Sequence, residues 1–267
     1  MFDVRPVDRH FAAIDAIADF PGITIPKKHG EIRERWAAAL TEPDPVAALT
    51  AAIITGRGDL QRAVLDAWGA AEASSATRAA VINETGGPVY LALLDAYQPQ
   101  AASNYAKIAS LFNQHADALH TACAQTDTDA PAEQLVAADD ATRAAWLTAQ
   151  LSAETLTSLL PPLIAVATLA GAHIHGPSVE LPLIADLTGC HRRRVWESLG
   201  AAGRTSRWGA LVACGAKLRA HPEPASIMAY DPPPPMETRQ VRSPDNIGIR
   251  QETYDPCDQE LASAVSA

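Results

Sequence analysis

Alanine limits the folds open to this chain more than any other residue type does. It supplies 54 of the 267 residues, whereas Phe, Trp and Tyr together account for 5%. Because alanine has the highest intrinsic helix propensity, an apolar content made mostly of small side chains favours helices. Hydrophobic residues make up 48% of the chain, too many for a wholly disordered protein. We therefore expect an all-α fold, a multi-helix bundle with ample length for a core.

Glycines and prolines mark where the expected helices end. Breaks are expected at Pro21–Gly22, Pro43 to Pro45, Gly86–Gly87–Pro88, Pro161–Pro162 and Gly176–Pro177. The glycine-glycine-proline triplet is the firmest break in the first half of the chain. Residues 125–131 are polar and acidic, and they are the best candidate for a domain boundary. The sequence thus predicts an N-terminal helical domain over 1–125 and a second helical region over 132–220, closed by a helix over 208–220.

The chain changes character after His221. Eight of the 20 prolines lie between Pro222 and Pro256, four of them in a row from Pro232, and apolar residues there are isolated. Such composition favours extended backbone with polyproline character. We expect residues 221–267 to form an extended Pro-rich tail that serves as a linker or as a partner-binding arm.

Compartment and membrane contact can be argued from what the sequence lacks. No run reaches the roughly 20 apolar residues of a membrane span, since the longest, 159–172, is interrupted by Pro161 and Pro162. The N-terminus lacks the basic, apolar and cleavage-site pattern of a secretion signal. Four cysteines lie far apart without a Cys-x-x-Cys pair, which fits reduced thiols. We therefore expect a cytoplasmic protein without membrane contact.

The sequence offers little support for an enzyme. It contains no Gly-x-Ser-x-Gly, His-Glu-x-x-His, dinucleotide-binding or phosphate-loop signature. His120 and Cys123 could share one helix face, and a looser group of histidines lies near Cys190, but neither set offers the ligands of a complete metal site. We expect a non-enzymatic protein, without a cofactor or a bound metal.

The stretch from Ser178 to Gly200 is the one whose spacing suggests a task. Apolar residues at helical spacing form one face of a short first helix and of a second helix: Ile184, Ala185 and Leu187, then Val195 and Leu199. Gly189 lies between them, where a tight inter-helix turn needs a positive φ. This pattern resembles the helix-turn-helix DNA-binding families. The resemblance implies that the second helix is a recognition helix that enters the major groove of DNA.

The local charge agrees with that interpretation. Between Thr188 and His221 seven basic residues accompany one acid, Glu197, so this segment carries +6. Because the whole chain carries −10, the remainder carries −16. A basic footprint on an acidic protein is typical of local contact with nucleic-acid phosphates. The predicted DNA-binding residues are His191, Arg192, Arg193, Arg194, Trp196, Arg204 and Arg207.

Two interpretations remain open. We expect a regulatory or partitioning DNA-binding protein, acting as a homodimer because one recognition helix gives little specificity. Pro182 inside the first helix, and the acids Glu180 and Asp186 beside it, depart from this pattern, and an ordinary helical hairpin has the same spacing. The alternative is a structural or adaptor protein of a larger assembly, such as a phage particle, whose C-terminal tail is a partner-binding arm.

Overall fold

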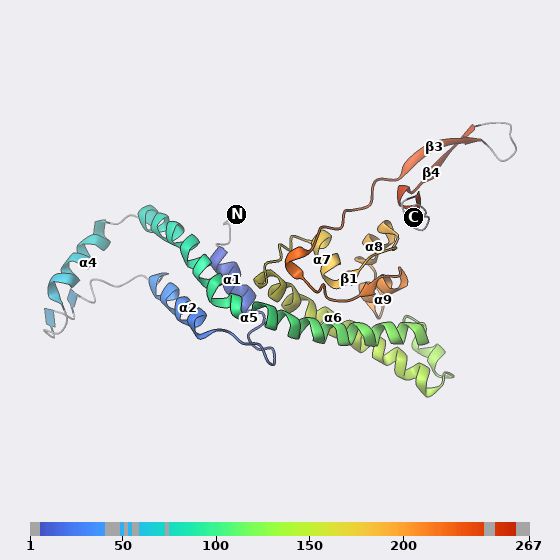
Figure 1. The fold of residues 1–267 in the computed structure, drawn as a ribbon, viewed down its shortest axis with the longest axis horizontal. Helices are drawn as coiled ribbons and strands as arrows, with labels where there is room; N and C mark the ends of the chain where they lie inside the picture. The colour runs from blue at the N-terminus through green and yellow to red at the C-terminus, as the bar shows by residue number, and fades with distance from the viewer. Residues whose placement is uncertain are drawn as a thin grey trace. The chain divides into compact units, whose positions relative to one another are not determined.

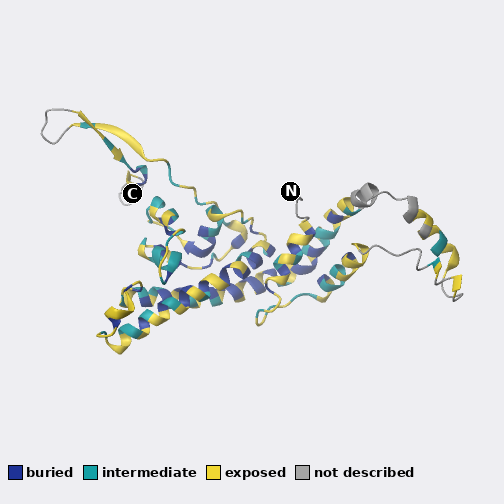
Figure 2. Cartoon of the chain, turned by 180° about the vertical axis from the view of Figure 1, so that it is seen from behind, coloured by how far each residue is buried: buried dark blue, intermediate teal, exposed yellow. Residues whose placement is uncertain are grey.

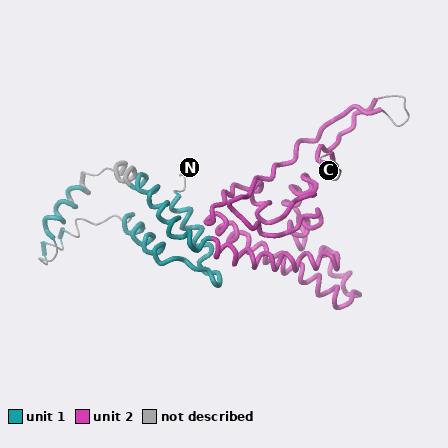
Figure 3. The backbone as a smooth tube through the Cα atoms, in the orientation of Figure 1, with its two compact units in different colours: residues 1–101 teal, residues 102–267 magenta. Residues whose placement is uncertain are grey.

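A computed structural model describes residues 6–40, 49–50, 53–54, 59–72, 75–242 and 249–259 (Figure 1). Helices hold 66% of the residues and strands 7%, so the expected largely all-α class is confirmed. The chain forms two compact units, Met1–Ala101 and Ala102–Ala267 (Figure 3). Their division falls inside a long helix and not in the acidic segment 125–131. The predicted break at Pro43 to Pro45 lies outside the described residues.

The described helices of unit 1 are α1 (Pro6–Asp15), α2 (Lys27–Leu40), α4 (Leu60–Glu72) and the first part of α5 (Ser75–Gln125). The apolar faces of α1, α2 and α5 meet in a small core. Val7, Trp36 and Leu93 form the buried centre, one residue each from α1, α2 and α5. On α4 the large side chains of Leu60, Leu65 and Trp68 are exposed instead, and Trp68 retains 67% of its accessible surface.

Two buried histidines connect α1 to α2. The Nε2 atoms of His10 and His29 lie 3.0 Å apart, within hydrogen-bonding distance, and both side chains are buried. Burial, and then the neighbouring His29, lower the pKa of His10 to about 4. Burial also lowers the pKa of His29. Both rings are therefore neutral at pH 7, and one can donate to the other.

The prediction of a helix break at Gly86–Gly87–Pro88 is wrong. α5 continues through this triplet and through Pro99 without interruption. A proline inside a helix removes one N–H donor and crowds the preceding turn, so some other contact must hold the helix together. Both prolines are exposed, while Leu93 and Tyr97 between them are buried in unit 1. Packing of one face thus outweighs the local preference of these residues for a turn.

Unit 2 is built on a helical hairpin. The rest of α5 lies beside α6 (Asp140–Leu169), and the connection contains a short 3-10 helix, η1 (Ala132–Leu135) (Figures 1 and 2). The Asp139 carboxylate caps α6 by accepting the Thr142 N–H at 2.7 Å. Phe112 and Leu119 on α5, and Leu156 and Leu163 on α6, are fully or almost fully buried.

α6 also runs through a predicted break. Pro161 and Pro162 lie inside the helix, and Pro162 is buried. Within the described part of the chain, α6 alone is long and apolar enough to cross a membrane by length and composition. Of its most apolar window, 56% is buried inside the protein, which is the burial of a core helix.

The segment predicted to form two helices has a strand between them. α7 (Pro177–Ile184) ends where the first helix was expected to continue, and Ala185–Asp186 form strand β1. Ala185 and Leu187 therefore do not lie on a helix, contrary to the prediction. Gly189 has the predicted positive φ, +77°. The next helix, α8 (Arg192–Ser198), buries Val195 as expected.

The predicted closing helix over 208–220 is shorter and ends in a strand. α9 (Ser206–Ala213) is followed by β2 (Lys217–Leu218), which pairs antiparallel with β1. Gly215, with φ +88°, ends the helix: its N–H donates to the Val212 carbonyl, and the Ala216 N–H donates to the Leu211 carbonyl. This is the Schellman pattern that terminates many helices.

Both edges of the chain around β2 have hydrogen-bond partners. On one side, the Arg219 and His221 N–H groups donate to carbonyls at the end of α7, each at 2.8 Å. On the other side, the Leu218 N–H donates to His120 Nε2 at 2.9 Å and the Ala220 N–H donates to Asn113 Oδ1 at 2.8 Å. Polar side chains of α5 thus take the place of a third strand.

The tail is not extended throughout. After a 3-10 turn, η2 (Pro224–Ser226), residues 227–236 have no regular structure. The strands β3 (Glu237–Arg242) and β4 (Ile249–Tyr254) then pair antiparallel over six residues each, which the sequence analysis did not predict. Residues along both strands are exposed or half-buried (Figure 2). We call residues 231–242 and 249–259 the C-terminal arm.

Candidate nucleic-acid interface

The basic residues at the start of α8 lie at different depths. Val195 is fully buried, which fixes the helix against the rest of unit 2. His191, Arg192 and Arg193 are half-buried, and Arg194 is exposed. The four consecutive basic side chains therefore form a partly covered surface.

The C-terminal arm covers part of this surface through Arg193. Its Nε donates to Asp255 Oδ2 at 2.5 Å, and its Nη2 donates to Asp255 Oδ1 at 3.0 Å. Nη2 also donates to the Pro234 carbonyl at 2.5 Å. The two side chains retain only 22% and 11% of their accessible surface. Arg193 thus contacts both the outgoing and the returning stretch of the arm.

Two more residues of α8 and its N-cap contact the arm. His191 Nε2 lies 3.0 Å from Asp258 Oδ1 and 3.9 Å from Asp255 Oδ2. The Trp196 indole N–H donates to the Asp231 carbonyl at 3.0 Å. Three of the seven predicted DNA-binding residues are therefore brought together by the structure, and the arm occupies all three.

The Asp255 carboxylate is held in its ionised form. The hydrogen bonds from Arg193 hold the pKa of this carboxyl well below its usual range, and the Cys257 N–H adds to the effect. A bidentate guanidinium–carboxylate pair has nearly the geometry of a guanidinium–phosphate pair. The surface at Arg193 thus binds an oxyanion within the protein itself.

Arg204, predicted to contact DNA, has a different role at the start of α9. Its guanidinium lies over the Trp146 ring and donates to Gln150 Oε1 at 2.5 Å. Its backbone N–H donates to Asp129 Oδ1 at 3.0 Å, and the Thr205 N–H donates to the same oxygen at 3.4 Å. Asp129 follows α5, so these contacts join α9 to the α5–α6 hairpin.

Arg207 is also engaged within unit 2. Its Nη1 donates to Glu180 Oε1 on α7 at 2.8 Å, and both side chains are mostly covered. Its guanidinium lies 4.8 Å from the centre of the buried Trp208 ring on its own helix. Arg204 and Arg207 therefore connect α9 to other helices of unit 2, whereas His191, Arg193 and Trp196 contact the C-terminal arm.

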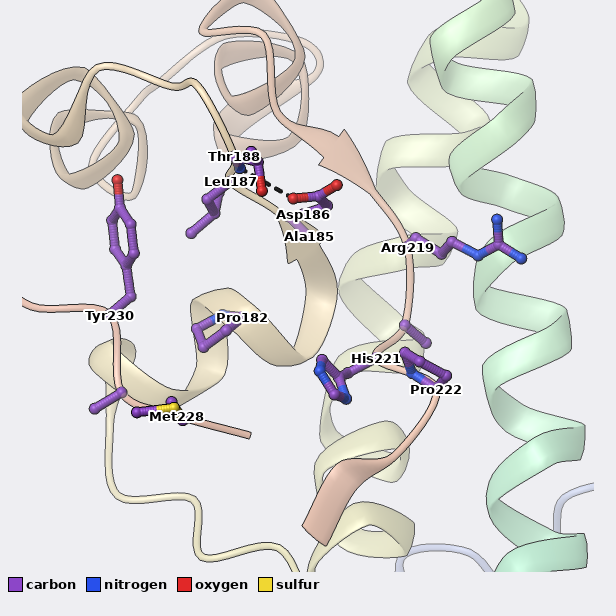
Figure 4. A pocket seen from close by; sticks show the side chains of 12 residues that line it. Pro182, Ala185, Asp186, Leu187, Thr188, Arg219, His221, Pro222, Met228 and Tyr230 are labelled. Atoms are coloured by element: carbon purple, nitrogen blue, oxygen red, sulfur yellow. Dashed lines mark hydrogen bonds between the residues drawn. The ribbon is translucent and has the colours of Figure 1, made fainter. Parts of the chain in front are cut away.

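A cavity of about 650 Å³ lies between β1 and the chain that follows β2 (Figure 4). Tyr230 and Pro182 line one side of it, and the Arg219 guanidinium points away from them (Figure 4). The carboxylate of Asp186 accepts the Thr188 N–H at 3.0 Å, and hydrogen bonds from Thr188 lower its pKa. The cavity thus offers the Asp186 carboxylate and the His221 imidazole, and both already accept a backbone N–H.

A second cavity, of about 520 Å³, lies beside α9 and includes His120 and Cys123. These two formed one of the two incomplete groups of metal ligands in the sequence. His120 Nε2 accepts the Leu218 N–H, and burial raises the pKa of the Cys123 thiol. In the part of the chain that the structure describes, no three His, Cys, Asp or Glu residues gather as metal ligands would.

The acidic partners of the predicted DNA-binding arginines were missed in the sequence. Asp255 is 62 residues from Arg193, and Asp129 is 75 residues from Arg204. No local spacing connects groups that far apart. Comparison with protein-family models, with curated proteins and with solved structures finds no match for the chain.

Proposed function

We propose that this chain is a non-enzymatic DNA-binding protein in which α8 and α9 act as a helix-turn-helix unit. The observation that carries the proposal is the consecutive basic group His191 to Arg194, whose member Arg193 holds a carboxylate in bidentate geometry. Carboxylate and phosphate are recognised by arginine in the same way. The +6 charge of the segment 188–221 adds long-range attraction for a polyanion.

The elements around α8 support the same proposal. Helix, strand, helix, helix and strand follow one another from α7 to β2, and the two strands are paired. This order resembles the winged form of the helix-turn-helix. In that arrangement α8 is the first helix of the unit and not the recognition helix that the sequence resemblance implied, and such a helix crosses the phosphate backbone. Arg192 and Arg194 then contact phosphates, which give affinity without reading bases.

The proposal is tested by binding to a fluorescent DNA duplex across a salt series. Arg192→Ala combined with Arg194→Ala leaves the Arg193–Asp255 pair in place. Two lost phosphate contacts should weaken binding and lower the slope of log K against log salt by about 1.8. Lys27→Ala with Lys28→Ala removes the same charge from α2, where Lys27 is almost fully exposed, and serves as the matched control. Equal loss in both double variants, or no binding at low salt, would reject the proposal.

A second candidate is the structural or adaptor role, and the β3–β4 hairpin favours it. Its residues are exposed or half-buried along both strands, so both faces and both edges are open to another chain. An isolated two-stranded hairpin is marginally stable alone, which is consistent with an arm that gains contacts in an assembly. A protein that retains no DNA at low salt would leave this role as the better proposal.

A further inference from the structure

The two ends of the arm contact α8 and its N-cap. Its outgoing stretch offers the carbonyls of Asp231 and Pro234 to α8, and its returning stretch offers the carboxylates of Asp255 and Asp258. Cys257, between the two acids, is buried. The paired strands between these ends are largely exposed. The arm is therefore held by one cluster of contacts, and most of those contacts fall on α8 and its N-cap.

Those contacts engage His191 and Arg193, two members of the basic group His191 to Arg194 that carries the proposed function. Asp255 and Asp258 supply two negative charges to His191 and Arg193, within 3.0 Å of each. A phosphate cannot contact the Arg193 fork while the Asp255 carboxylate occupies it. Arm and DNA would thus be mutually exclusive at this surface.

We infer that the C-terminal arm is an autoinhibitory segment, whose Asp255–Asp258 turn occupies the α8 surface and competes with DNA phosphates for it. This inference rests on the proposed function. In the closed state the Arg193 guanidinium is hydrogen-bonded to Asp255 and to the Pro234 carbonyl of the arm. Bound DNA would satisfy the same guanidinium, so the exchange replaces one oxyanion by another. Because only molecules with a released arm can bind at this surface, the apparent dissociation constant for DNA is the intrinsic constant divided by the fraction of released molecules.

The test compares two charge reversals on the same arm of the full chain. Asp255→Arg places a cation against Arg193 and should detach the arm. Glu252→Arg makes the same change of net charge, but Glu252 pairs with Arg239 inside the hairpin. Each protein is measured for DNA affinity by fluorescence anisotropy, and for hydrogen exchange of the amides in 249–259.

We expect Asp255→Arg to speed exchange in 249–259 and to raise DNA affinity about tenfold more than Glu252→Arg does. Equal gains in affinity from the two variants, with the arm released only in Asp255→Arg, would overturn autoinhibition and leave DNA binding intact. Unchanged exchange in Asp255→Arg would overturn it as well, because the arm would then not depend on this pair. If the released variant retains no DNA at 50 mM salt, the proposed function itself fails.

Discussion

α8 and α9 begin in similar ways and differ in what covers them. Both have arginines at or near their first turn, and in both an aspartate distant in sequence accepts hydrogen bonds there. On α9 that aspartate is Asp129, in the connection of the α5–α6 hairpin. On α8 it is Asp255, at the end of an exposed β-hairpin. Hydrogen bonds to an aspartate thus fix α9 to the α5–α6 hairpin. In our proposal, similar hydrogen bonds hold α8 to an arm that can be released.

The difference follows from what each acid is attached to. Asp129 is held by a connection whose neighbours are buried, and α9 below it places Trp208 and Leu211 in the core. Moving Asp129 therefore means disturbing packed helices. Moving Asp255 exposes Cys257 and a few polar contacts, and the arm regains conformational freedom. The local opening free energy should accordingly be much lower at α8.

The largest predicted effect is a loss of folding stability when the core contact of α9 is removed. Trp208 is fully buried, donates from its indole N–H to Thr157 Oγ1 at 2.8 Å and meets Phe112 edge to face. Trp208→Ala should lower the free energy of unfolding by about 3–5 kcal/mol. The melting temperature should fall by about 2–4 °C per kcal/mol in a chain of this size.

The matched variant is Trp196→Ala on α8. Trp196 is half-buried and donates its indole N–H to the arm, so its loss should loosen the arm and cost the folded core little. Circular dichroism melts of both variants, with hydrogen exchange of 249–259, make the comparison. Equal losses of stability would show that α8 is as firmly built into the core as α9.

The next largest effect is a loss of stability in acid, and it should fall on unit 1 and not on α8 or α9. In unit 1, burial lowers the pKa of His10 to about 4 and lowers that of His29, whereas histidine in the unfolded chain titrates near 6.5. Arg33 and Asp15 are the charged groups that face this pair. As pH falls from 6.5 to about 4, the unfolded state takes up protons that the folded unit resists, so unit 1 loses stability.

The arm should stay closed over the same pH range. Arg193 holds the pKa of Asp255 well below its usual range, so this carboxylate remains ionised at pH 4. Hydrogen-exchange protection should therefore fall in α1 and α2 while that of 249–259 persists. His10→Gln removes one titrating group and should flatten the response of unit 1. Earlier loss of protection in the arm than in α1 would contradict this assignment.

Local sequence signals predicted part of this structure. Alanine content indicated helices, Gly189 indicated a left-handed turn, and Val195 was expected inside. Gly215 could have indicated the end of α9 in the same way, since a glycine after a helix commonly adopts positive φ. Each of these depends on one residue and its immediate neighbours.

The remaining features depend on contacts that local patterns do not contain. Pro88, Pro99 and Pro162 lie inside helices because packing against neighbouring helices compensates for the lost backbone hydrogen bonds. The strand β2 forms because β1 pairs with one of its edges and His120 of α5 accepts the Leu218 N–H at the other. In the candidate interface, the arginines were evident from sequence, but the acids that cover them were not.

The smallest predicted effect sharpens the comparison at the start of α9. Asp129 Oδ1 accepts the Arg204 and Thr205 N–H groups, as a capping carboxylate does, so Asp129→Ala should cost about 1 kcal/mol. Asp117→Ala removes an exposed carboxylate from α5 and should change stability by less than about 0.5 kcal/mol. Urea unfolding of both variants measures the difference. DNA affinity should not rise in Asp129→Ala, because this acid does not cover any residue of the basic group His191 to Arg194. A gain comparable to that of Asp255→Arg would mean that α9 is released as readily as α8, and the distinction between the two helices would then be lost.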